Sequence, residues 1–219
     1  MTQLYDFAAM RAEMVATQLK ERGIGDTAVL RAMNTIPREF FVEDAYKEMA
    51  YYDSPLPILA GQTISQPYIV ALMISLLEPK PEHHFLEIGA GSGYAAAVMS
   101  LLVSEVYTIE RHQILVDYAR DCLSTLHCKN VFVHYGDGTQ GWPEHAPYDG
   151  IIVAAGGPSI PCALRQQLKI GGHLIMPVGK MQRRQDLIRL TRTGDDQYRR
   201  KNFGPVAFVP LVGEEGWPE

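Results

Sequence analysis

The chain has 219 residues, of which 47% are hydrophobic and 21% charged, and its formal net charge is −5. These proportions are typical of a globular protein with a packed core and exclude a disordered or fibrous chain. The net negative charge argues against a general nucleic-acid binder or an anionic-membrane binder, because such proteins need a cationic surface. Short basic runs at 183–184 and 199–201 are typical of solvated loops that flank a hairpin.

The cysteines and the hydropathy indicate where the protein works. Cys122, Cys128 and Cys162 are odd in number and lack C-x-x-C spacing, which favours neither a disulfide framework nor a zinc site. The chain opens without a basic stretch followed by an apolar run, and nowhere do about eighteen apolar residues follow one another. We therefore expect a cytoplasmic protein without a membrane span.

The first third of the chain is expected to be mainly helical. Apolar residues recur at helical spacing over 7–21, and Gly23 offers a stop. Asp26 is expected to cap a second helix, and a third short helix is expected over 43–49. A loop rich in Pro, Gly, Thr and Ser over 56–66 then leads into an apolar helix.

From residue 84 onward, short apolar runs alternate with helical stretches, which predicts a doubly wound, mostly parallel α/β sheet. The expected strands are 84–88, 105–109, 131–134, 148–154 and 173–178, and the expected helices are 94–103, 113–125 and 160–168. After Gly179 the periodicity becomes two-fold, so two antiparallel strands, at 186–191 and 206–211, are expected at the edge of the sheet.

The clearest motif is an apolar strand that runs directly into a glycine turn and a helix over 85–94, with the sequence Phe-Leu-Glu-Ile-Gly-Ala-Gly-Ser-Gly-Tyr. Glycine lets a ligand approach the backbone closely and tolerates positive φ. Glu110 ends the next strand, about twenty residues beyond the first glycine, where a carboxylate can accept hydrogen bonds from both ribose hydroxyls. The spacing predicts a nucleotide-type site; a tight structural turn and an ordinary surface acid are the alternative interpretation.

A nicotinamide enzyme would use the same layout, and two details favour S-adenosylmethionine. The glycines follow G-x-G-x-G rather than G-x-G-x-x-G. Glu87 precedes them, where its carboxylate can hold the cationic ammonium group of a methionine moiety, whereas a pyrophosphate prefers uncompensated backbone N–H groups. Asp137 follows the next strand and is placed on the same rim to accept from the adenine amine, although Asp-Gly is also a common turn pair.

Several segments, taken in order, resemble the protein-L-isoaspartate O-methyltransferases over nearly the whole chain. They are 37–42 (Pro-Arg-Glu-Phe-Phe-Val), 56–58, 61–67 (Gly-Gln-Thr-Ile-Ser-Gln-Pro), 86–94, 136–138 and 208–212 (Phe-Val-Pro-Leu-Val). The resemblance implies methyl transfer from S-adenosylmethionine to the free α-carboxylate of L-isoaspartyl residues in damaged proteins. The ester would then close to a succinimide that reopens partly to aspartate, so that the cycle repairs the protein.

The resemblance also implies a Rossmann-like methyltransferase fold with an N-terminal helical segment and a C-terminal antiparallel edge. We expect a single domain over 1–219, with a helical part and active-site loop (1–80), a cofactor-binding core (81–180) and antiparallel strands (181–219). Isoaspartyl-containing proteins and peptides are the expected partners. We expect no binding to nucleic acid or to membranes. We also expect the protein to be a monomer.

By the same resemblance, the cofactor residues carry over to Gly89, Gly91, Gly93, Glu110, Asp137 and Gly138. Thr63, Glu87 and Ala90 are expected to bind the cofactor beside them, although Ala90 stands where many members carry a threonine. Gln62 and Ile64 fall in the substrate loop, and the family's catalytic serine maps onto Ser65. Because Ser65 stands just before Gln66, Pro67 and an apolar helix, it is also expected to be the N-cap of that helix. Val212 departs from members that carry a hydroxyl residue at its place.

The expected chemistry needs alignment rather than a base. An α-carboxylate with a pKa of about 3.5 is already ionised at neutral pH, so Ser65 would only orient it by donating a hydrogen bond. His83, His84 and His134 flank expected strands and are interpreted as structural, and no metal site is predicted. Two rivals stay open: a methyltransferase acting on another group, and a non-catalytic S-adenosylmethionine-binding protein.

Overall fold

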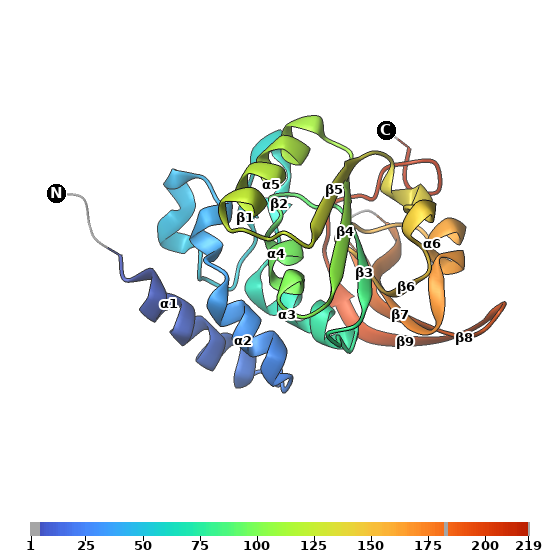
Figure 1. Cartoon of the computed structure of the whole chain (residues 1–219), viewed down its shortest axis with the longest axis horizontal. Coiled ribbons are helices and arrows are strands. Elements are labelled where there is room, and N and C mark those ends of the chain that lie inside the picture. Colours follow the sequence, from blue (N-terminus) through green and yellow to red (C-terminus); the bar gives the residue numbers. More distant parts are fainter. Residues whose placement is uncertain (1–4, 182–183, 219) are drawn as a thin grey trace.

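The computed structural model describes residues 5–181 and 184–218, so Arg183 of the first basic run lies outside the described residues. Within them, seven strands form one sheet in the order β5-β4-β3-β6-β7-β8-β9 (Figure 1). The strands are β3 His84–Ile88, β4 Glu105–Glu110, β5 Val131–Tyr135, β6 Tyr148–Val153, β7 Leu168–Met181, β8 Arg184–Gly194 and β9 Gln197–Val206. The first five of these run parallel, and β8 and β9 add an antiparallel edge. The expected doubly wound class is confirmed.

Helices cover both faces of the sheet. They are α1 Phe7–Glu13, α2 Thr27–Thr35, α3 Pro67–Leu76, α4 Tyr94–Ser100, α5 Gln113–Thr125 and α6 Cys162–Gln166. The N-terminal helices, α3, α4 and α5 pack with Phe85 on one face, while α6 packs with Leu86 on the other. Neighbouring residues of one strand point to opposite faces, and residues 85–88 of β3 are buried on both sides of the sheet.

The helical expectations for the first third are confirmed, with small departures. The first helix continues from α1 as a π-helical segment, Met14–Lys20. Asp26 caps α2, its Oδ1 accepting from the backbone N–H groups of Ala28 at 2.9 Å and Val29 at 3.1 Å. The third helix is 3₁₀ rather than α, over Asp44–Met49. Within the 56–66 loop, β1 Leu56–Pro57 and β2 Thr63–Ile64 pair as a short hairpin.

The last expected strand was wrong. No strand runs over 206–211; instead β9, Gln197–Val206, pairs antiparallel with β8. Most of β9 is exposed on both faces, so its side chains carry no apolar alternation for a sequence pattern to show. The segment that follows β9 is held by backbone hydrogen bonds to Gly156. Gly156 N donates to Val209 O at 2.8 Å, and Leu211 N donates to Gly156 O at 2.8 Å.

The sheet reverses its winding direction beside β3. The chain adds β4 and then β5 on one side of β3 and returns to place β6 on the other. In open α/β sheets such a reversal leaves a crevice at the carboxyl ends of the strands, where ligands bind. In the described part of the chain, no helix has the length and apolar character that crossing a membrane requires.

Candidate active site

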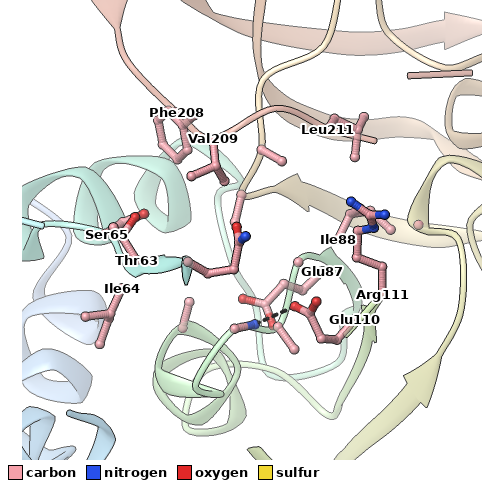
Figure 2. Close-up of a pocket in the computed structure, with 18 of the residues that line it drawn as sticks. Thr63, Ile64, Ser65, Glu87, Ile88, Glu110, Arg111, Phe208, Val209 and Leu211 are labelled. Carbon is pink, nitrogen blue, oxygen red and sulfur yellow. Dashed lines mark hydrogen bonds between the residues drawn. The ribbon is translucent and has the colours of Figure 1, made fainter. Parts of the chain in front are cut away.

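A cavity of about 280 Å³ lies at the reversal point, and we call it the inner cavity. Its walls are the glycine turn, the loop over 61–65, the end of β4 and the segment over 208–212 (Figure 2). Small-molecule sites span roughly 300–1,000 Å³, so this cavity is close to the lower end of that range. Four segments far apart in sequence thus meet around one space.

The glycine turn forms the floor. Gly89 and Gly91 line the cavity with φ of +89° and +54°, values at which a side chain would be strained. Ala90 lines it as well. Gly93, with φ +89°, is the left-handed N-cap of α4 and does not line the inner cavity, so its place is structural. A Cβ at Gly93 would approach that of Ala119 to 3.3 Å.

Glu110 holds the turn in shape. Its side chain is buried at the end of β4, and its Oε2 accepts from Gly91 N at 2.9 Å (Figure 2). Its Oε1 accepts from His112 N at 3.0 Å. Each carboxylate oxygen has a further lone pair, so both can still accept from a ligand's hydroxyl groups.

Glu87 is the most unusual group in the cavity wall. It lies opposite Thr108 on the neighbouring strand, is 1% exposed, and accepts from Thr108 Oγ1 at 2.6 Å. Burial raises the pKa of Glu87 to about 8; the hydrogen bond from Thr108 lowers it and the charge of Glu110 raises it further. A buried acid beside another acid is stabilised as a carboxylate by a cation, and a pyrophosphate would aggravate the repulsion.

Ser65 lies on the far side of the cavity from these acids. Figure 2 shows Ser65 and Phe208 on one side, with Glu110 and Arg111 on the other. Gln62, Thr63 and Ile64 line the cavity beside Ser65.

The expectation that Ser65 caps α3 was wrong. The N-cap is Gln66, and the N–H of Tyr68 donates at 3.0 Å to Oδ1 of Asp53, fifteen residues upstream. No described residue hydrogen-bonds the Ser65 hydroxyl. The cap comes from a distant segment, which local sequence spacing does not reveal.

Asp137 does not line the inner cavity, although Gly138 does. Oδ1 of Asp137 accepts from Thr139 N and Oγ1, both at 2.8 Å, and Oδ2 accepts from Glu214 N at 2.8 Å. The side chain therefore fixes its own turn and the C-terminal segment. The other expected site residues all line the inner cavity, whereas Asp137 and Gly93 do not.

The C-terminal segment was expected to cover the site, but none of its residues was assigned to the site from the sequence. Residues 208–212 line the inner cavity, as do Arg111 and His112 just after β4. The segment is held by the Trp217 indole, which donates to Gly156 O at 3.0 Å, and by Glu215, which accepts from Cys162 N at 2.6 Å. Arg111 and His112 could have been assigned to the site from the sequence, because they directly follow a predicted strand.

A second hollow of about 600 Å³, the outer groove, adjoins the inner cavity. The two share Thr63, Ser65, Ala154, Phe208 and Val209 as wall residues. Two of the described residues that line the outer groove, Arg22 and Arg184, are cationic, and none is acidic. Ser65 thus lies where the inner cavity meets a larger groove with cationic wall residues.

The described residues hold no group of three or more His, Cys, Asp or Glu side chains placed to bind a metal ion. Of the three histidines named from the sequence, none lines the inner cavity, and His134 packs against Trp142 with ring centroids 4.7 Å apart.

Comparison with known proteins gives consistent results. The family model for protein-L-isoaspartate(D-aspartate) O-methyltransferase (PCMT) matches residues 10–216. Protein-L-isoaspartate O-methyltransferase 1 of Rhodopseudomonas palustris (strain HaA2) is 55% identical over 211 residues, which cover 96% of this chain and 86% of that protein. The protein-L-isoaspartate O-methyltransferase of Brucella anthropi is 49% identical over 214 residues, 98% of each chain.

Solved structures agree. One, named protein-L-isoaspartate O-methyltransferase, superposes with a TM-score of 0.86 at 31% identity and covers 94% of this chain and 67% of its own. Another, a beta-aspartate methyltransferase structure from Plasmodium falciparum with S-adenosyl-L-homocysteine, gives 0.78 at 25% identity, covering 92% and 98%. On this evidence the chain belongs to the protein-L-isoaspartate O-methyltransferase family.

Proposed function

We propose that this protein transfers a methyl group from S-adenosylmethionine to the free α-carboxylate of L-isoaspartyl residues in damaged proteins. The observation that carries the proposal is the place of Ser65, between a cavity suited to the cofactor and a groove suited to a peptide. The relatives named above act on L-isoaspartyl residues by name, and they match this chain over nearly its whole length.

The inner cavity fits S-adenosylmethionine. Glu87 offers a buried acid that a cationic ammonium group would stabilise in its ionised form. Glu110 offers free lone pairs to ribose hydroxyls, and Gly91 lets the ligand approach the backbone. When bound, S-adenosylmethionine supplies an electrophilic methyl group. An adenine contact from Asp137 is part of the proposal, and it would have to coexist with the bond from Glu214 N.

Ser65 needs only to orient the nucleophile. The α-carboxylate of an isoaspartyl residue, with a reference pKa of about 3.5, is ionised at neutral pH and needs no base. Ser65 donates a hydrogen bond to one carboxylate oxygen and leaves the other to attack. Attack neutralises charge, so a cation on the carboxylate would stabilise the ground state more than the transition state. Arg22, a cationic wall residue of the outer groove, already forms an ion pair with Asp53.

The ester then leaves the enzyme's control. The backbone nitrogen of the next residue attacks the ester carbonyl, methanol leaves with the amide proton, and a succinimide ring forms. Water opens the ring at either carbonyl, which returns part of the material to normal aspartate. We propose that flexible segments of many proteins enter the outer groove, that the enzyme is a monomer, and that it works in the cytoplasm, where its free cysteines stay reduced.

Paired peptides test the proposal. The protein is incubated with methyl-labelled S-adenosylmethionine and two peptides that differ only in an aspartyl or isoaspartyl linkage. Label in the isoaspartyl peptide alone supports the proposed function. Label in both peptides would point to methylation of another group, and binding of cofactor without transfer to either would indicate a non-catalytic binding protein.

A further inference from the structure

The N-terminus of α3 has an acceptor that comes from elsewhere in the chain. The first N–H groups of a helix lack partners within it, and Pro67 at the first position has no N–H to satisfy. The next donor is Tyr68 N, and it is bound by Oδ1 of Asp53 at 3.0 Å. Oδ2 of Asp53 also accepts from the Gln66 side-chain amide at 3.3 Å.

Arg22 braces this cap from a third segment. Its guanidinium forms an ion pair with the Asp53 carboxylate and lies over the Tyr68 ring, 3.6 Å from the ring centroid. The side chain of Asp53 is 19% exposed, against 44% for that of Arg22, so the pair is partly shielded from water. Two distant turns therefore hold the residues that directly follow Ser65.

Ser65 and Asp53 compete for one donor. A serine that caps a helix accepts from the N–H two or three residues later, and the N–H three residues after Ser65 is that of Tyr68. Because Asp53 occupies this N–H, the Ser65 hydroxyl has no partner among the described residues and lines both the inner cavity and the outer groove.

We propose that Asp53 is a positioning residue that caps α3 in place of Ser65 and so keeps the Ser65 hydroxyl available to the substrate carboxylate. This rests on the proposed function. Without Asp53, the serine hydroxyl rotates to satisfy Tyr68 N, and its donor no longer meets the carboxylate. Arg22 keeps Asp53 in place.

Asp26 provides a matched control. It caps α2 by accepting from the backbone N–H groups of Ala28 and Val29, and neither of these residues lines the inner cavity or the outer groove, whereas Tyr68, which Asp53 caps, lines the outer groove. Asp26→Ala and Asp53→Ala each remove one capping carboxylate and should lower thermal stability, the second by somewhat more because it also breaks the ion pair with Arg22. Only the Asp53 change reaches Ser65.

The test is a double-mutant cycle on the full-length protein with an isoaspartyl peptide and saturating S-adenosylmethionine. Asp53→Ala should lower kcat by about 10-fold with cofactor Kd within about twofold, while Asp26→Ala leaves kcat within about twofold. In a Ser65→Ala background, Asp53→Ala should cost less than about twofold more, because the group it positions is gone. Asp53→Asn, which keeps a neutral acceptor, should restore most of the rate. Equal losses in both backgrounds, or an unchanged kcat, would overturn the proposal.

Amide hydrogen exchange at Tyr68 measures the competition between Asp53 and Ser65 for this N–H independently of enzyme activity. Exchange should stay slow in Ser65→Ala and in Asp53→Ala, and should accelerate about 10-fold only in the double variant, where both acceptors are lost. Fast exchange in Asp53→Ala alone would show that Ser65 does not take over. If the wild-type protein methylates no isoaspartyl peptide, the proposed function fails, while this exchange measurement still decides the role of Asp53.

Discussion

The two sides of the inner cavity are held in different ways. On the cofactor side, Glu87 and Glu110 lie on adjacent strands, and the glycine turn follows one of those strands directly. On the substrate side, Ser65 depends on Asp53 and Arg22, and the facing segment is fixed by Glu214, 77 residues from its partner Asp137. The cofactor side is thus built by strand register, whereas the substrate side is assembled by contacts between distant segments.

The largest expected effect of breaking the cofactor side comes from Glu110→Ala. The change removes the acceptor of Gly91 N and His112 N together with the proposed ribose acceptor. Hydrogen bonds to charged groups contribute roughly 1.5–3 kcal/mol, so cofactor Kd should rise by about 100-fold. At saturating cofactor, kcat should change by less than about threefold. Calorimetric titration measures the affinity, and a Kd within twofold of wild type would contradict the assignment.

The cofactor side of the cavity could be predicted from the sequence to a greater extent than the substrate side. β3 and α5 begin and end where their apolar patterns predict, and the glycine turn with Glu110 lies in the expected place. These features depend on neighbours along one strand or the next. The partner of Tyr68 N was not predictable, because Asp53 lies in an irregular turn whose position no strand or helix pattern sets.

Asp137 and β9 show the same limit. Asp137 stands on the predicted rim, but its carboxylate binds Glu214 N of a segment that no local pattern places there. The edge strand β9 was missed because its exposed, charged side chains show no apolar alternation.

The pKa of Glu87 predicts how the stability of the cofactor side depends on pH. Its pKa is raised from 4.5 to about 8 in the folded protein. Between these values the unfolded chain releases the proton and the folded protein keeps it, so the free energy of unfolding falls as pH rises, and the fall stops above about pH 8. One such group contributes about 1.4 kcal/mol per pH unit.

The variant Glu87→Gln, which cannot ionise, should lack this contribution. In urea unfolding without cofactor, its stability relative to wild type should rise steadily from about pH 5 to about pH 8. Parallel curves for the two proteins would show that Glu87 is ionised throughout.

The smallest expected effect concerns the outer groove. Arg22 and Arg184 are its charged wall residues among those described, and Arg184 is exposed, so a peptide with acidic residues beside the isoaspartyl site should have a lower KM than one with lysines. Arg184→Ala should reduce this preference by about threefold at low salt and by less at high salt. Arg199→Ala, on the exposed β9, is the control, and an equal effect from both changes would place the preference outside the groove.

The most direct test of the division between the two sides is kcat for Ser65→Ala with an isoaspartyl peptide, measured at saturating S-adenosylmethionine alongside cofactor Kd. If Ser65 orients the carboxylate and takes no part in holding the cofactor, kcat should fall by about 10- to 100-fold while Kd stays within twofold. An unchanged kcat would remove Ser65 from this role, and a large rise in Kd would show that the two sides of the cavity are not separate.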